Sequence, residues 1–118
     1  MAAGFETALD KTDEIQLTTT GRVTGRQTSR PVWFVRQQDK LYLVPVTGSD
    51  SQWYKNVVKT PAVGLAASNA ASGGTATPVT DPRAVQGVLD DLRAKYGTQL
   101  VASYYPHPDV AVEVTLES

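Results

Sequence analysis

The sequence contains no cysteine and only one histidine, His107, among its 118 residues. Without thiols the chain can form neither a disulfide framework nor a thiolate metal site, and it has no cysteine nucleophile. One histidine cannot supply the histidine pair of a zinc site, and its place between two prolines favours a surface loop. The G-x-S-x-G motif of serine hydrolases is absent as well. We therefore expect no bound metal and no hydrolytic nucleophile.

Long apolar runs and strong net charge are also missing. The chain begins MAAGFETALDKTDE, which is acidic and lacks the apolar segment of a secretory signal. No stretch is long enough to span a membrane. With a formal net charge of -1, 41% hydrophobic residues and 19% charged residues, the composition is typical of one globular domain. These features predict a single domain over residues 1–118, a cytoplasmic location and no membrane insertion.

Acidic residues are absent from one segment in particular. Between Glu14 and Asp39 there is no aspartate or glutamate, but there are four arginines: Arg22, Arg26, Arg30 and Arg36. A nucleic-acid partner usually requires an extended basic surface, which the acidic remainder of the chain does not provide. The segment therefore predicts a local anion site and no nucleic-acid partner.

The hydrophobic pattern predicts an α+β fold with about six mostly antiparallel strands and two or three helices. Strands are expected at 14–20, 28–36, 41–46, 62–67, 74–79 and 109–117, and helices at 5–11, 51–59 and 82–96. In the second helix, Trp53, Val57 and Val58 are expected to point inward; the third carries an apolar stripe that includes Tyr96 and ends at Gly97. In the last strand, Ala111 is expected on the wet face with Glu113. Because short turns join most strands and the helices are inserted between them, an antiparallel barrel is favoured over a parallel sheet.

Two neighbouring strands have no polar face. Their sequences are VWFV, within the strand expected at 28–36, and LYLVPV at 41–46. A barrel wall of this kind must be covered on its outer side by a helix or by a second subunit. We favour the second subunit and so predict a homodimer.

Three short stretches contain candidate binding residues. GRVTGR, at 21–26, combines flexible glycine backbone, threonine hydroxyls and guanidinium groups, which suit a phosphate or a carboxylate. GSDSQWYKN, at 48–56, leads into a helix N-terminus, where free backbone N–H groups attract anions or electron-rich rings. ASYYPHPD places two tyrosines before a proline-rich loop. From the residues alone, each has a structural alternative: a solvated loop, a core tryptophan, or packing of the tyrosines.

Six stretches within residues 14–117 resemble the deazaflavin-dependent nitroreductase and quinone reductase family: LTTTGRVTGR, VWFVR, LYLVPVTGSDSQWYKNVVKTPAV, LRAKYG, YYP and VAVEV. The patterns TTGRxTG and WY-x-N-x-x-x-x-P carry the resemblance together. Members of this family are split β-barrels related to flavin-binding, pyridoxamine-phosphate-oxidase-like proteins. The resemblance therefore implies an FMN-binding-like split barrel that binds coenzyme F420, with FMN as the alternative cofactor.

The resemblance also implies roles for particular residues. The phosphate and glutamate tail of the cofactor would contact Arg22, Thr24, Gly25, Arg26 and Arg30. The deazaflavin ring would contact the backbone of Pro45, Val46, Thr47 and Gly48, and would be covered by Trp53, Tyr54, Lys55 and Asn56. The catalytic candidates, which would hydrogen-bond the reduced oxygen of the acceptor, are Tyr104 and Tyr105.

The implied activity is hydride transfer from reduced F420 to a small organic acceptor, such as a quinone, a nitro compound or an activated alkene. The chain departs from the family pattern in two places. Val23 stands where better-known quinone-reducing members have a basic residue, and the loop TGSDSQW before the tryptophan is shorter than theirs. Two alternatives stay open: an FMN-dependent reductase, and a non-catalytic split barrel that binds a flavin, haem or fatty acid.

Overall fold

The computed structural model describes residues 8–9, 12–38, 40–67, 70–105 and 108–117. Its elements are, in order, β1 (Ile15–Thr20), β2 (Gln27–Val32), β3 (Val35–Gln37), β4 (Lys40–Leu43), the 3₁₀ turn η1 (Gly48–Asp50), α2 (Gln52–Lys59), β5 (Ala62–Ala67), β6 (Ala70–Val79), α3 (Pro82–Tyr96), α4 (Thr98–Tyr104) and β7 (Ala111–Leu116). Of the helix expected at 5–11, Ala8 and Leu9 are helical, and the rest lies outside the described residues.

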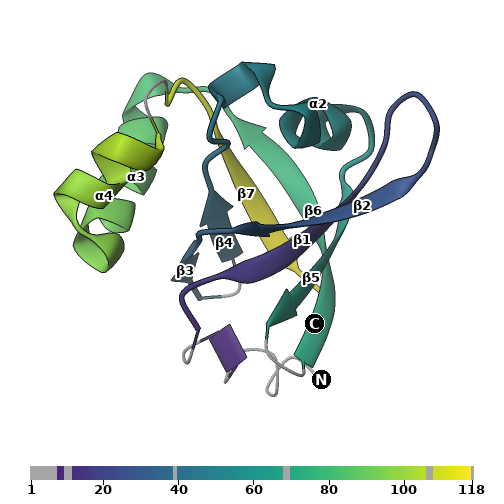
Figure 1. The fold of residues 1–118 in the computed structure, drawn as a ribbon, viewed down its shortest axis with the longest axis horizontal. Coiled ribbons are helices and arrows are strands. Elements are labelled where there is room, and N and C mark those ends of the chain that lie inside the picture. Colours follow the sequence, from purple (N-terminus) through teal and green to yellow (C-terminus); the bar gives the residue numbers. More distant parts are fainter. Residues whose placement is uncertain (1–7, 10–11, 39, 68–69, 106–107, 118) are drawn as a thin grey trace.

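The strands of this part of the chain form one antiparallel sheet in the order β2-β1-β5-β6-β7-β4-β3. Its two edge strands, β2 and β3, are separated in sequence only by Trp33 and Phe34. A linker this short spans at most about 11 Å between flanking Cα atoms. The sheet must therefore curl until its edges approach each other, and Figure 1 shows this open barrel. The predicted α+β split barrel is confirmed, with seven strands rather than six.

The additional strand arises where one strand was expected at 28–36. β2 pairs with β1, the chain then leaves that partner at Trp33 and Phe34, and β3 pairs with β4 instead. At this break the backbone N–H of Phe34 donates to the hydroxyl of Tyr96 (3.2 Å), and its carbonyl accepts from Nζ of Lys95 (2.8 Å). In the linker, hydrogen bonds to side chains of α3 therefore replace the backbone hydrogen bonds of a sheet.

The elements differ from the sequence-based expectations in four further details. The strand expected at 41–46 ends at Leu43, before the buried Pro45. β6 begins at Ala70, so residues assigned to a loop belong to a strand. Val58, expected to point inward from α2, is 53% exposed. The helix α4 was not expected at all.

The buried apolar residues form two clusters, one inside the barrel and one between the barrel wall and the helices α3 and α4. The second cluster explains why two strands have no polar face. Val35 of β3 and Val44, which directly follows β4, pack with Val88 and Leu92 of α3 on the outer side of the barrel. In Figure 1, α3 and α4 lie together beside this part of the barrel. The expected cover is therefore supplied by helices of the same chain, and the reason for predicting a second subunit no longer applies.

The helix α3 begins and ends where its sequence predicted. Asp81 is its N-cap, with the carboxylate accepting a hydrogen bond from the N–H of Ala84 (3.1 Å), and Pro82 follows as the first helical residue. Gly97, with φ of +100°, ends the helix and allows α4 to begin immediately afterwards. No helix in the part of the chain that the structure describes is long and apolar enough to cross a membrane.

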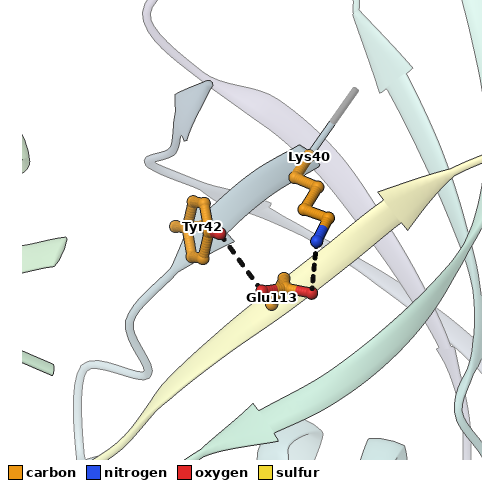
Figure 2. Close-up of polar contacts among 3 residues, drawn as sticks. All are labelled: Lys40, Tyr42 and Glu113. Carbon is orange, nitrogen blue, oxygen red and sulfur yellow. Dashed lines mark hydrogen bonds and ion pairs between the residues drawn. The ribbon is translucent and has the colours of Figure 1, made fainter. Parts of the chain in front are cut away.

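The polar side of β7 carries a small hydrogen-bonded group. Figure 2 shows the carboxylate of Glu113 between Tyr42 and Lys40, both of β4. The tyrosine hydroxyl donates to it (3.1 Å), and Nζ of the lysine lies 3.4 Å from its other oxygen. A half-buried ion pair at the surface of a sheet stabilises the fold little, but it matches the β4–β7 register. Ala111, expected on the same wet face, is instead buried beneath the helices.

Candidate functional site

The turn between β1 and β2 is closed by its own backbone. The N–H of Gly21 donates to the carbonyl of Arg26 (2.8 Å), and the N–H of Gly25 donates to the carbonyl of Gly21 (2.9 Å). The hydroxyl oxygen of Thr24 accepts from the N–H of Arg26 (3.2 Å). Gly25 has φ of +73°, a conformation that glycine adopts at little cost. The segment GRVTGR is therefore an ordered turn and not a loose loop.

Arg22 joins this turn to the helix α2. Its Nη1 donates to Oδ1 of Asn56 (2.8 Å) and its Nη2 to Oε1 of Gln52 (2.8 Å). The same oxygen of Asn56 also accepts from the backbone N–H of Arg22 (3.2 Å). One turn farther along the same face of α2, Nζ of Lys59 donates to the carbonyl of Arg22 (2.9 Å). The partners of the guanidinium group are neutral, so its positive charge is kept while its position is fixed.

The turn and α2 therefore form a basic region. Arg22, Arg26, Lys55 and Lys59 belong to it, and no carboxylate among the described residues forms an ion pair with any of them. An anion that approaches this region meets several cations and the free donors of a guanidinium fork. The electrostatics fit the phosphate or carboxylates that the sequence pattern predicted for this segment.

A pocket of about 380 Å³ opens at the N-terminal end of α2, the helix that Arg22 contacts. It lies between the end of β2, the chain from β4 to α2, and the end of α4. Its lining residues are Arg30, Pro31, Val32, Trp33, Val44, Val46, Thr47, Ser51, Trp53, Tyr104 and Tyr105. Most of these side chains are apolar or aromatic, with a few polar groups among them, as in sites for small organic molecules. Both tryptophans of the chain line it.

An aromatic group forms one wall of the pocket. Trp33 is stacked on Tyr96 with ring centroids 4.3 Å apart, and Tyr104 covers its other side at 4.4 Å. Tyr105 meets the edge of the group, 5.1 Å from the ring of Tyr104. Burial raises the pKa of the Tyr105 hydroxyl, and the neighbouring phenols raise it further. This hydroxyl is therefore protonated throughout the physiological pH range and can serve as a hydrogen-bond donor.

The segment between β4 and α2 forms the opposite wall, and it is fixed by Asp109. One carboxylate oxygen accepts from the N–H of Ser49 (2.9 Å), and the other accepts from its hydroxyl (2.6 Å). Within the segment, the N–H of Gly48 donates to the carbonyl of Pro45 (3.0 Å). The loop TGSDSQW therefore has a defined shape.

The residues predicted from sequence fall into three groups. Those that line the pocket are Arg30, Val46, Thr47, Trp53, Tyr104 and Tyr105. Those in the turn are Arg22, Thr24, Gly25 and Arg26. The remaining ones support the two regions: Pro45, Gly48, Tyr54 and Asn56 are buried, and Lys55 is half-buried. Their roles toward a cofactor stay predictions, but the structure brings distant stretches of sequence to one end of the barrel.

Sequence reasoning missed several residues of this region. Trp33 was treated only as part of a buried strand, yet it lies in the pocket wall. Gln52 was not considered, although it binds Arg22. Tyr96 was expected only in the apolar stripe of a helix, and its partner Trp33 is 63 positions away in sequence. The contact between Tyr96 and Trp33 arises from the tertiary fold, so no local sequence pattern predicts it.

The fold places the protein among the α+β split β-barrels, and comparison with known families specifies the family. The profile of the F420H(2)-dependent quinone reductase family matches residues 2–102. The chain therefore belongs to this family, in agreement with the resemblance found in its sequence. A comparison with curated proteins finds no match.

Solved structures confirm the fold. The chain is similar to a structure described as an F420-H2 dependent reductase, FDR-A, with a TM-score of 0.68 and 20% identity over 86% of this chain and 93% of that one. It is also similar to HutZ, the heme storage protein from Vibrio cholerae (TM-score 0.76, 13% identity, 98% and 89% of the two chains). A third is a domain-swapped dimer (TM-score 0.69, 18% identity, 96% and 95%). Identities this low concern the fold alone.

The residues present fit the cofactor of the family. F420 carries a phosphate and carboxylates, and the turn offers Arg26 and Arg22 without any described carboxylate in competition. A Cβ atom placed on Gly25 would meet nothing within 4 Å, so the backbone there is open to a ligand. The aromatic pocket at the N-terminal end of α2 provides room for a flat ring.

Proposed function

We propose that this protein is an oxidoreductase that uses reduced F420 to reduce a small planar acceptor, such as a quinone or a nitroaromatic compound. The observation that carries this proposal is the juxtaposition of a basic turn, with no described acidic partner, and an aromatic pocket lined by both tryptophans. The turn suits the anionic tail of the cofactor, and the pocket suits its ring and the acceptor. Membership of the F420H(2)-dependent quinone reductase family supports this assignment.

In this proposal the protein orients its ligands and excludes water. The turn binds the tail of the cofactor through Arg26 and through the guanidinium group of Arg22, which α2 holds in place. Backbone groups between Pro45 and Gly48, together with Trp53, hold the ring. When bound, reduced F420 supplies a hydride from C5, and a quinone then needs one hydride and one proton to become a hydroquinone.

Tyr105 is the proposed donor to the oxygen on which negative charge develops. Its buried side chain lies at the pocket, and its raised pKa keeps the hydroxyl protonated. Tyr104, which is 38% exposed, covers Trp33 and shapes the entrance. We expect Tyr105→Phe to lower kcat with menadione by about tenfold to a hundredfold, with little effect on F420 affinity. Unchanged turnover in both Tyr105→Phe and Tyr104→Phe would remove the proposed role of these hydroxyls.

The cofactor assignment can be tested by titrating the protein with F420 and, separately, with FMN. Because both tryptophans line the pocket, quenching of their fluorescence reports binding directly. We expect saturable F420 binding that Arg26→Ala weakens, and turnover of reduced F420 when menadione is added. FMN binding without F420 binding would change the chemistry to that of a flavin. Binding of F420 without turnover of quinones or nitroaromatics would contradict the reductase and favour a carrier.

We also propose that the protein is a homodimer. Support comes from the structurally similar protein described as a domain-swapped dimer and from the edge strand β2, whose residues are all exposed except Val32. A strand with an unpaired edge readily pairs with another chain. Sedimentation equilibrium should give twice the mass of one chain, and a monomer at micromolar concentration would refute this proposal.

A further inference from the structure

We propose that Arg30 selects the acceptor, by favouring planar aromatic acceptors that carry a carboxylate. This inference rests on the proposed reductase function for its biological meaning, but binding alone can test it. It also gives Arg30 a different role from the cofactor tail contact that the sequence pattern implied.

The register of the β1–β2 pair places Arg30 on the same face of the sheet as the core, where its side chain is exposed at the pocket. Arg30 lies opposite Leu17, and the next inward pair is Val32 opposite Ile15. Opposed residues of an antiparallel pair point to the same face, and both β1 residues are buried in the core. The neighbouring Ser29 is on the outer face, where its hydroxyl lies 2.6 Å from that of Thr18. On this face of the sheet the Ile15–Val32 pair has two apolar residues, whereas the Leu17–Arg30 pair has an arginine on β2.

The surroundings leave this cation without a described partner. Arg30 lines the pocket, and no aspartate, glutamate, lysine or histidine is found among the lining residues of the described chain. No described carboxylate forms an ion pair with it. The pocket therefore combines aromatic walls with one guanidinium group, which can bind a carboxylate bidentately. A flat aromatic acid matches both features, whereas a neutral ring of the same shape matches only the walls.

The same cation is too far along β2 to act as part of the turn. Arg26 precedes the strand and Arg30 follows four residues later, which corresponds to about 13 Å along an extended chain. Arg22 is held against α2 by Asn56 and Gln52. Arg30 instead shares the pocket with Tyr105, the proposed donor to the acceptor oxygen. Its position therefore points to the acceptor and not to the anionic tail of the cofactor.

An isosteric pair of ligands tests the inference: 4-nitrobenzoate and 4-nitrobenzamide, which differ in charge but hardly in shape. Nitroaromatic rings quench tryptophan fluorescence, so the affinity of each can be measured on the full-length protein without cofactor. We expect the protein to bind the carboxylate about fivefold more tightly than the amide at low salt, and the preference to shrink as salt is added. With reduced F420, the ratio of kcat/KM should favour the carboxylate similarly.

Three variants make the test specific. Arg30→Gln should abolish the preference, and Arg30→Lys should keep part of it, because it retains the charge but loses the planar fork. Arg83→Gln, at an exposed site on α3, removes the same charge outside the pocket and should preserve the preference. Equal thermal unfolding of the variants will show that the fold is intact, as expected for an exposed side chain.

Several results would overturn the inference. Equal affinity of the wild-type protein for the two ligands, absence of binding by both, or a preference that survives Arg30→Gln would each do so. A preference unchanged in Arg30→Gln, together with weaker F420 binding, would return this residue to the cofactor. A charge preference that depends on Arg30 in a protein that does not bind F420 would support the pocket assignment and refute only the proposed cofactor.

Discussion

Replacing Asn56 with alanine removes the side chain that holds the β1–β2 turn against α2. Its Oδ1 accepts two hydrogen bonds from Arg22, one from Nη1 at 2.8 Å and one from the backbone N–H at 3.2 Å. Asn56 is only 8% exposed, so water cannot easily replace the lost acceptor. We expect a loss of both stability and anion affinity, because the turn and the guanidinium group lose their shared anchor.

The size of the stability loss follows from these contacts. A hydrogen bond to a charged group contributes about 1.5–3 kcal/mol and a neutral one about 0.5–1.5 kcal/mol. Alanine recovers roughly 0.5 kcal/mol because it is the better helix former. The net loss should be about 2–3 kcal/mol, which for a chain of 118 residues corresponds to a fall in Tm of roughly 8–12 °C.

Differential scanning calorimetry and F420 titration measure the two effects. Gln52→Ala is the matched control, because Gln52 is exposed and its Oε1 accepts a single bond, from Nη2 of Arg22 at 2.8 Å. This control should lose less than about 1 kcal/mol. If Asn56→Ala melted within about 2 °C of the wild type, Asn56 would not anchor the turn.

Asn56→Asp separates the anchor from the charge. The carboxylate keeps the acceptor geometry toward Arg22 and adds an ion pair, so Tm should stay within about 4 °C of the wild-type value. The same carboxylate neutralises the guanidinium group and should weaken F420 binding by about three- to tenfold, most strongly at low salt. Unchanged affinity would mean that the charge of Arg22 does not contribute to anion binding.

Two further predictions concern the fold around the site. Tyr96→Phe removes the hydroxyl that accepts from the N–H of Phe34, and should lower Tm by about 4–12 °C. Because burial raises the pKa of Tyr96 from its usual value near 10 to about 12, its contribution is intact below pH 10 and is lost as pH rises to about 12. Urea midpoints should therefore fall over that range, and less steeply in the variant; identical slopes would contradict this linkage. Gly25→Ala, at φ of +73° in open space, should lose about 1 kcal/mol, and Gly25→Asn should lose less; equal losses would indicate that the backbone conformation is not the cause.

The sequence predicted the elements whose signals are local. The helix α3 has a capping aspartate, a first-turn proline, an apolar stripe and a terminal glycine, all within residues 81–97. The strands β1 and β7 alternate in the way that one buried face requires. The helix α4 was missed because it begins directly after that glycine, which was interpreted only as the end of a helix. A local pattern is therefore insufficient where one residue, such as Gly97, both ends one helix and precedes the next.

The sequence segments that form the candidate site could be predicted, but the contacts between them could not. The turn, the loop before α2 and the tyrosines at the end of α4 are the candidate binding segments predicted from sequence, and all lie at one end of the barrel. The sequence could not show that Arg22 is already bound to α2, because Asn56 is 34 positions away. It also could not separate Arg30 from the other arginines, since their equal spacing conceals the change from turn to strand.

The linker between β2 and β3 shows why the remaining contacts could not be predicted. Trp33 and Phe34 have the composition of a buried strand, and the strand is interrupted only because β3 finds its partner in β4. That choice is stabilised from a distance: Lys95 and Tyr96 of α3 bind the backbone of Phe34, and Tyr96 stacks on Trp33. Because the strand is interrupted here, β2 and β3 become the two edges of the curled sheet, and the side chain of Trp33 lines the pocket. Since the same contacts create both, substitutions at Tyr96 should alter the pocket as well as stability, whereas substitutions at Arg30 should alter only the pocket.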